Sequence, residues 1–136
     1  MEIKYEEASY YGQTKMNKHG ESIRHGLGAI YYNNGRYYEG QWVNGLRHGD
    51  GTEFFNESQN LYTGQFHKGK AQGTGTYKWA NGEEYTGEWY QGLRNGKGKW
   101  TGLNKNSFYE GDWIDGKAHG YGVHTWKNGK FIQITQ

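Results

Sequence analysis

The chain has 136 residues, among them 24 Gly, 13 Tyr and 6 Trp but no Pro or Cys, and its net charge is +2. Hydrophobic residues make up only 32% of it, and more than half of these are aromatic. Aliphatic side chains are therefore too few for a thick helix-on-sheet core, while the many rings exclude a disordered chain. Balanced charge argues against general attraction to nucleic acid, and the absence of Cys excludes disulfides and fits a reducing compartment.

The N-terminal segment, residues 1–9, is expected to form an arm or an edge strand, because Ile3 and Tyr5 alternate with polar residues. The opening MEIKYEEASY resembles neither a secretory signal nor a transit peptide. No apolar run approaches the roughly 18 residues that a transmembrane helix needs. We therefore expect a cytoplasmic protein that is not secreted.

A tandem repeat occupies residues 10–131. Gly-x-Gly pairs begin at positions 26, 49, 73, 96 and 120, and a Tyr-x-Gly-x-Trp/Phe element precedes each of the last four pairs. Between the two elements lies a turn signal, namely Asn44-Gly45, Lys68-Gly69, Gln91-Gly92 or Asp115-Gly116. The pattern divides the array into units 38–61, 62–84, 85–108 and 109–131, preceded by a degenerate unit of about 10–37. Residues 132–136 form the C-terminal end, which could close the last hairpin.

Each unit is predicted to be a β-hairpin, because its first element alternates with period two and Asn-Gly is a strong turn signal. A two-residue turn at Asn44-Gly45 places Val43 opposite Leu46, Gly40 opposite Gly49, and Tyr38 opposite Gly51. In the third unit, a three-residue loop at Asn81-Gly82-Glu83 places Trp79 beside Tyr85 and Gly75 beside Trp89.

The glycines are expected to leave room for rings that lie flat across the neighbouring strand. Half-burying one ring of about 200 Å² contributes on the order of 2–3 kcal/mol. That exceeds the roughly 0.5–1 kcal/mol that a strand glycine costs. Burial of rings against glycines can therefore hold such a hairpin together.

The predicted fold class is all-β, a single-layer, twisted, elongated antiparallel meander of about ten strands. Its aromatic face comprises Tyr38, Trp42, Phe55, Tyr62, Phe66, Tyr77, Trp79, Tyr85, Trp89, Trp100, Tyr109, Trp113 and Trp126. Its opposite face is mixed and polar, with Glu39, Gln41, His48, Thr74, Lys78, Glu88, Lys97, Asp112 and Lys117.

These elements resemble the MORN repeat, in which Tyr-x-Gly-x-Trp/Phe is followed by a turn glycine and then by His/Asn-Gly-x-Gly. The resemblance covers four units from Tyr38 to about Phe131. In the preceding unit, Tyr10-Tyr11-Gly12 lies five residues too far upstream and Thr14 replaces the Trp, so its first strand is in question and the unit could act as a cap. The resemblance implies a rod-like, non-enzymatic scaffold, similar to small cytoskeletal and ciliary members such as radial-spoke head components.

The candidate partner-binding groove consists of eleven rings: Tyr38, Trp42, Tyr62, Phe66, Trp79, Tyr85, Trp89, Trp100, Tyr109, Trp113 and Trp126. An uncovered apolar face of this kind often marks an interaction site. The open edge strands offer a second route to partners. Protein partners in a larger assembly are expected, although the termini or a homodimer could cover the same face.

A second candidate is a basic strip of Lys70, Lys78, Lys97, Lys99 and Lys117, which would suit an anionic membrane or phosphoinositide. Regulation of an enzyme in trans is a further alternative. No cofactor, metal or catalytic residue is predicted. His25, His48 and His119 recur because the repeat does, and Glu88, Glu110 and Asp112 occupy positions where Gln also occurs.

Overall fold

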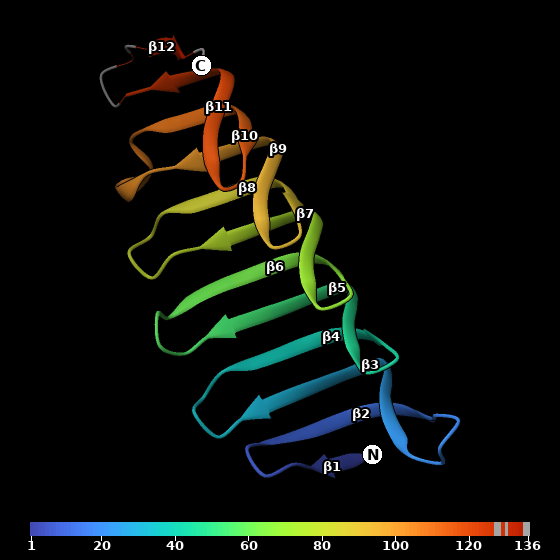
Figure 1. Ribbon diagram of the computed structural model, residues 1–136. Coiled ribbons are helices and arrows are strands. Elements are labelled where there is room, and N and C mark those ends of the chain that lie inside the picture. The colour runs from blue at the N-terminus through green and yellow to red at the C-terminus, as the bar shows by residue number, and fades with distance from the viewer. Residues whose placement is uncertain (127–128, 130, 135–136) are drawn as a thin grey trace.

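Within the described part of the chain, every strand pairs with the next one, so that twelve antiparallel strands form one sheet in sequence order. The computed structural model describes residues 1–126, 129 and 131–134. The elements are β1 (Glu2–Lys4), β2 (Ala8–Met16), β3 (Ser22–Tyr32), β4 (Tyr37–Val43), β5 (Leu46–Phe55), β6 (Asn60–His67), β7 (Lys70–Lys78), β8 (Glu84–Tyr90), β9 (Leu93–Thr101), the 3-10 turn η1 (Leu103–Lys105), β10 (Phe108–Ile114), β11 (Lys117–Thr125) and β12 (Phe131–Ile134). Figure 1 shows an elongated stack with β1 and β12 at opposite ends. The predicted all-β single-layer meander is confirmed.

The four predicted hairpin turns have two residues, both with positive φ, as a type I′ turn requires. In the first of them, Asn44 has φ 50° and Gly45 has φ 83°. Val43 and Leu46 then pair across the turn as predicted. The corresponding pairs at the other turns are His67–Lys70, Tyr90–Leu93 and Ile114–Lys117.

Beyond the turn the predicted register is wrong by two residues, because a β-bulge interrupts each hairpin. Gly40 pairs with Gly51 instead of Gly49, and Tyr38 pairs with Glu53 instead of Gly51. Gly49 lies in the bulge with φ +75°, a left-handed conformation that glycine adopts readily. A slip of two residues keeps every side chain on its face of the sheet, so the predicted aromatic face survives.

The predicted pairing between β7 and β8, at the end of the unit 62–84, is also wrong by two residues. The last paired residues of β7 and β8 are 78 and 84, so the loop has five residues instead of three. Tyr85 therefore pairs with Tyr77 instead of Trp79, and Trp89 pairs with Gly73 instead of Gly75. Here too the even shift preserves the faces.

The sheet is bent along its length at the bulges. In Figure 1 the first parts of β3, β5, β7, β9 and β11 lie at a steep angle to the rest of the sheet, which is flatter. The bend in β5 brings together Arg47 and Glu53, whose side chains are hydrogen-bonded at 2.5 Å. Six residues of straight strand would span about 20 Å. We call the side enclosed by this bend the inner face, and the opposite side the outer face.

The degenerate first unit forms a hairpin of the same type. Gly12 pairs with Gly28, and the fully buried Tyr10 donates from its hydroxyl to the carbonyl of Gln13 at 2.6 Å. The five additional residues extend the strands by the pair Met16–Ser22 and lengthen the loop between β2 and β3 from two residues to five. This unit therefore continues the sheet to β1, which pairs with β2.

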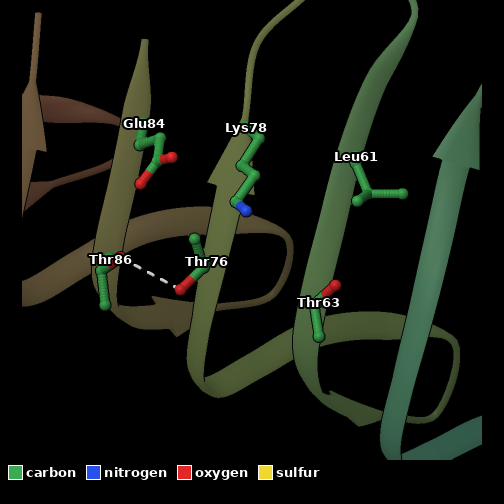
Figure 2. Close-up of a pocket in the computed structure, with 6 residues that line it drawn as sticks. All are labelled: Leu61, Thr63, Thr76, Lys78, Glu84 and Thr86. Atoms are coloured by element: carbon green, nitrogen blue, oxygen red, sulfur yellow. Dashed lines mark hydrogen bonds between the residues drawn. The ribbon is translucent and has the colours of Figure 1, made fainter. Parts of the chain in front are cut away.

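The flat outer face carries a row of threonines across β5 to β8, Thr52, Thr63, Thr76 and Thr86. Figure 2 shows part of this row beside a shallow hollow of about 380 Å³, with the Thr76 and Thr86 hydroxyls bonded at 3.0 Å. Nearer the N-terminus the outer face also carries a series of neighbouring rings, which the sequence analysis did not predict: Tyr11, Tyr31, Tyr37 and Phe54.

Candidate functional site

The inner face is lined by an unbroken series of nine rings that runs along the molecule. Neighbouring rings meet edge to face, with centroids 4.9–5.6 Å apart and interplanar angles of 81–90°. Each such pair contributes about 0.5–1.5 kcal/mol beyond the area that it buries. The series is Tyr10, Trp42, Tyr38, Phe66, Tyr62, Trp89, Tyr85, Trp113 and Tyr109.

Each tyrosine of the series lies flat over a glycine of the next strand. A Cβ on Gly51 would lie 2.3 Å from the Tyr38 hydroxyl oxygen. That hydroxyl donates to the carbonyl of Gln41 at 2.8 Å, on the same strand. The expected role of the glycines therefore holds, although the partner of Tyr38 in strand register is Glu53 and Gly49 serves the bulge.

The tryptophans connect consecutive units. The indole Nε1–H of Trp42 donates to the carbonyl of Gly28 at 2.9 Å. Trp89 and Trp113 make the equivalent bonds to glycine carbonyls of the preceding unit, both at 3.1 Å. Phe66 has no donor to make this bond, so its unit is joined to the preceding one by ring contacts alone at this position.

Of the eleven rings predicted to form a groove, eight are buried and make up the core of this thin fold: Tyr38, Trp42, Tyr62, Phe66, Tyr85, Trp89, Tyr109 and Trp113. Trp79 and Trp100 are partly buried against them, and Trp126 is 41% exposed. The structure thus separates a covered floor from a more accessible row of rings.

The accessible row lies near the longer loops that connect each hairpin to the next one. It comprises Phe55, Tyr77, Trp79, Trp100 and Trp126. Tyr77 contacts Trp79 with ring centroids 4.8 Å apart, and Trp126 stacks on His124 at 4.2 Å and 12°. These side chains present apolar edges on the inner face that a partner could contact.

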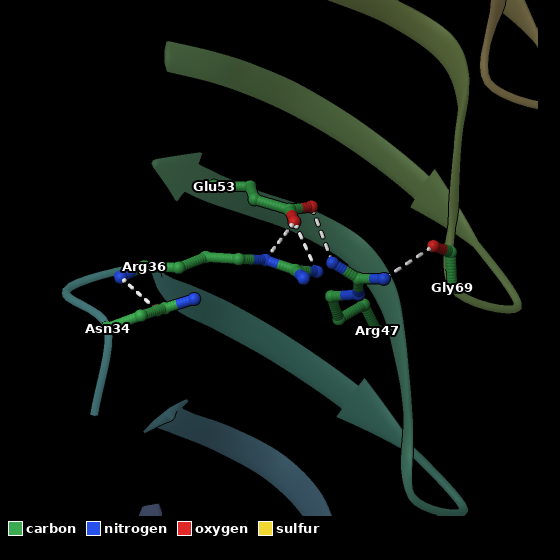
Figure 3. Close-up of polar contacts among 5 residues, drawn as sticks. All are labelled: Asn34, Arg36, Arg47, Glu53 and Gly69. Atoms are coloured by element: carbon green, nitrogen blue, oxygen red, sulfur yellow. Dashed lines mark hydrogen bonds and ion pairs between the residues drawn. The ribbon is translucent and has the colours of Figure 1, made fainter. Parts of the chain in front are cut away.

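An ion-pair cluster of Arg36, Arg47 and Glu53 crosses the bend (Figure 3) and lines the same hollow as Phe55 and Tyr77 of this row. Glu53 is only 5% exposed, and its two carboxylate oxygens accept from Arg47 Nη1 at 2.5 Å and from Arg36 Nη2 at 2.9 Å. Arg47 also donates to the carbonyl of Gly69 at 3.1 Å. In the other units the position of Glu53 holds an apolar or aromatic residue or a histidine: Ile30, Tyr77, Trp100 and His124.

The bulges are held by a recurring side chain that the sequence analysis did not recognise. The side-chain oxygen of Gln41 accepts from the backbone N–H of Asp50 at 2.7 Å, across the bulge. The equivalent acceptors in the other hairpins are Gln13, Gln65, Glu88 and Asp112. The recurrence of Gln, Glu or Asp after the central glycine was the available signal. Glu88 and Asp112 thus have a structural role.

The recurring histidines also contact the backbone. His25 Nδ1 accepts from the N–H of Asn44 at 3.1 Å, and His48 Nδ1 accepts from the N–H of Lys68 at 3.4 Å. Within the described part of the chain, no three His, Asp or Glu side chains are grouped so that they could hold a metal ion. His25 and His48 therefore join neighbouring hairpins.

The five lysines predicted as a basic strip are not brought together. Lys70 and Lys117 lie beside hairpin turns, at the starts of β7 and β11. On the outer face each of the others has an acid opposite it in the sheet: Lys78 faces Glu84, Lys97 faces Asp112, and Lys99 faces Glu110. The ion pair with Lys97 holds the pKa of Asp112 below its ordinary value. The strip is thus an alternation of charges.

Burial of the tyrosines affects their ionisation. It raises the pKa of Tyr85 to about 12, and it also raises the pKa values of Tyr38 and Tyr62. These hydroxyls accordingly remain protonated hydrogen-bond donors at neutral pH. Among the residues that the structure describes, no helix is long and apolar enough to cross a membrane.

The MORN repeat family model matches residues 38–57, 62–84, 85–106 and 109–131. Among solved structures, the chain is similar to the TCP domain of SAS-4 (dCPAP) from Drosophila melanogaster in complex with a proline-rich motif of Ana2 (dSTIL), at 17% identity, covering 98% of this chain and 82% of that one, with a TM-score of 0.48. A comparison with curated proteins finds no match. Since the repeat model matches well over half of the sequence, the chain belongs to the MORN-repeat family.

Proposed function

We propose that this protein is a non-enzymatic scaffold that binds segments of other proteins along its inner face. MORN repeats are protein- and membrane-binding scaffold modules. The observation that carries the proposal is the accessible row of Phe55, Tyr77, Trp79, Trp100 and Trp126 on an inner face that no second layer of the described residues covers. The buried rings form the floor of this surface, and the accessible row makes the contacts.

The geometry suits an extended partner better than a small molecule. The row follows the long axis of the sheet, across successive hairpins. Exposed aromatic edges of this kind act as anchors in protein interfaces. The ends of the sheet at β1 and β12 offer unpaired strand edges as a second route to the same class of partner.

A selection of displayed random peptides on the purified protein tests the proposal. Enriched peptides are expected to shift the indole N–H signals of Trp79 and Trp100 in a two-dimensional NMR titration. Trp79→Ala should weaken binding, whereas Tyr31→Ala on the outer face should not. Circular dichroism verifies that both variants stay folded. Enriched peptides that bind equally well to the Trp79→Ala variant, or that map to the outer face, would refute the inner-face assignment.

We place this scaffold in a cytoplasmic, multi-subunit assembly of the cytoskeleton or cilium, as the resemblance to small cytoskeletal and ciliary members suggests. Proximity labelling in cells tests this, and a list of neighbours without cytoskeletal or ciliary proteins would contradict it. The alternation of Lys and acidic residues on the outer face gives membrane binding no comparable support. Sedimentation with anionic vesicles at low salt is expected to leave the protein in the supernatant.

A further inference from the structure

Three units place an arginine in the same surroundings. Arg24, Arg47 and Arg94 each lie in the steep part of an odd-numbered strand. Each guanidinium donates through Nη2 to the carbonyl of a glycine in the next hairpin turn, namely Gly45 at 2.9 Å, Gly69 at 3.1 Å and Gly116 at 2.5 Å. Each also lies over a ring of that next unit, Trp42 at 4.7 Å, Phe66 at 5.8 Å and Trp113 at 4.7 Å from the centroid. The repeat thus builds a guanidinium site at the junction of two units.

The junction between the third and fourth units lacks its arginine. Ala71 occupies the position of the arginine, because it pairs with Phe66 in the same way that Arg47 pairs with Trp42 in the preceding unit. The backbone there is unchanged, because the N–H of Gly92 donates to the carbonyl of Ala71 at 2.8 Å. The equivalent bonds to the arginine carbonyls at the other three junctions are 2.8–2.9 Å long. Only the side chain is missing.

A hollow of about 330 Å³ opens where that side chain would lie. Arg94, one unit further along, has its guanidinium near Trp79, Tyr85 and Trp113 and bonded to the Gly116 carbonyl. The residues one unit earlier that correspond to these four are Phe55, Tyr62, Trp89 and Gly92, and all of them line the hollow. The hollow therefore keeps the ring faces and the turn glycine of a guanidinium site, without the guanidinium.

We propose that this hollow binds the arginine side chain of a partner protein segment lying along the inner face. The inference rests on the proposed function and names one residue of the partner. A planar, weakly hydrated guanidinium can stack on the Trp89 ring and donate to the Gly92 carbonyl, as Arg94 does at the next junction.

The charged groups around the hollow do not attract a guanidinium by themselves, so the rings and the Gly92 carbonyl have to supply the binding. Arg36 and Arg47 are both paired with Glu53, and the exposed Lys70 lies at the rim. Arg24 and Arg47 already occupy consecutive junctions, so the fold accommodates guanidinium groups in neighbouring units. Because basic side chains outnumber Glu53 here, an anion is the competing occupant that the experiment has to exclude.

The experiment titrates the wild-type protein with three blocked amino acids, N-acetyl-arginine methylamide and its norleucine and glutamate counterparts. The Trp89 indole N–H and the Leu93 amide report on the hollow by NMR. The arginine compound is expected to bind in the millimolar range and at least about fivefold more tightly than the other two. Equal binding of norleucine would make the hollow merely apolar, and tighter binding of glutamate would make it an anion site. Either result, or no shift with arginine, overturns the proposal.

Two variants supply matched controls. Ala71→Arg fills the hollow with the protein's own side chain, so the Trp89 shifts with the arginine compound should disappear. Arg94→Ala should create a second site, seen as new shifts of the Trp113 indole N–H. Shifts of Trp89 that persist in a folded Ala71→Arg variant would contradict the proposal.

The peptides selected on the wild-type protein separate this inference from the proposed function. If they bind the inner face equally well after their arginines are replaced by norleucine, the scaffold function stands and the arginine site fails. If no peptide is enriched although the arginine compound binds the hollow, the proposed function fails by itself.

Discussion

Gly98 provides the sharpest test of how glycines and rings hold this sheet together. It pairs with Gly87 on one side and Gly111 on the other, and the ring of the fully buried Tyr85 lies across it. A Cβ on Gly98 would lie 2.2 Å from the Tyr85 hydroxyl oxygen and 2.4 Å from two ring carbons. Gly98→Ala therefore forces the ring to move.

The size of the effect follows from these contacts. Carbon atoms pack at about 3.5–4.0 Å, so the ring must shift by more than about 1 Å. It is confined by Trp89 and Trp113, each with its centroid 5.2 Å away, and overpacking of this kind costs about 1–3 kcal/mol. Loss of the hydrogen bond from the Tyr85 hydroxyl to Glu88 adds about 1 kcal/mol, while replacing a strand glycine returns about 0.5–1 kcal/mol. The net destabilisation expected is about 1–3.5 kcal/mol.

Urea unfolding of a double-mutant cycle measures this value. The Gly98→Ala change is made in the wild type and in a Tyr85→Leu background, where the ring is absent. In the second background the substitution should cost close to nothing, which gives a coupling energy of about 2 kcal/mol. Hydrogen exchange of the amides in β8 to β10 shows whether the loss is local, as expected of a repeat array. An equal cost in both backgrounds would refute the assignment of Gly98 as the residue that makes room for Tyr85.

Three further predictions test the inner face and the bulges. Glu53→Gln leaves two guanidinium groups without their carboxylate and should lower the free energy of unfolding by about 2–3 kcal/mol. This value is smaller than that of a fully buried ion pair because Arg36 is 38% exposed. An unchanged thermal unfolding temperature would contradict the prediction. Gln41→Leu removes the acceptor for the Asp50 N–H and should lower the free energy of unfolding, measured in urea, by about 1 kcal/mol. Gln41→Glu should be tolerated, because Glu88 accepts the equivalent hydrogen bond in another unit. Similar losses of stability for both variants would count against the role of Gln41 in the bulge. Burial raises the pKa of Tyr85 to about 12, so the folded state keeps a proton that the unfolded state releases near pH 10. The contribution of Tyr85 to stability is therefore complete below pH 10 and falls by up to about 1.4 kcal/mol per pH unit toward pH 12. Tyr85→Phe should reduce this dependence of the unfolding free energy on pH, measured by urea unfolding, and an unchanged dependence would argue against the burial effect.

Local chemistry accounts for the parts of the fold that could be predicted. Asn44-Gly45 and Asp115-Gly116 favour φ > 0 at both turn positions, which specifies a type I′ hairpin without help from the rest of the chain, whereas in the Lys68-Gly69 and Gln91-Gly92 turns only the glycine does so. The alternation in Tyr-x-Gly-x-Trp places its rings on one face, and an even slip in register does not change that face. Fold class and aromatic face therefore follow from short-range patterns.

The accessible part of the candidate site did not follow from the sequence. Trp89 and Trp79 both carry the pattern of a ring on the aromatic face, yet Trp89 is buried and Trp79 is only partly so. The difference arises because Trp89 lies inside the bend and contacts the neighbouring unit. Exposure is set by the curvature of the whole sheet, which a two-residue period does not encode.

The sequence by itself determined that this protein is a tandem array of glycine- and ring-bearing hairpins in one sheet. Only the tertiary structure decided where each hairpin slips and bends, because the bulge depends on a hydrogen bond that the backbone N–H of Asp50 donates to the side-chain oxygen of Gln41 on the paired strand. The same holds for the pairing of Glu53 with Arg47 across the bend and for the hollow at Ala71. An alanine in the sequence is only a small residue. It becomes a candidate binding site because the neighbouring units show that a guanidinium fits in its place.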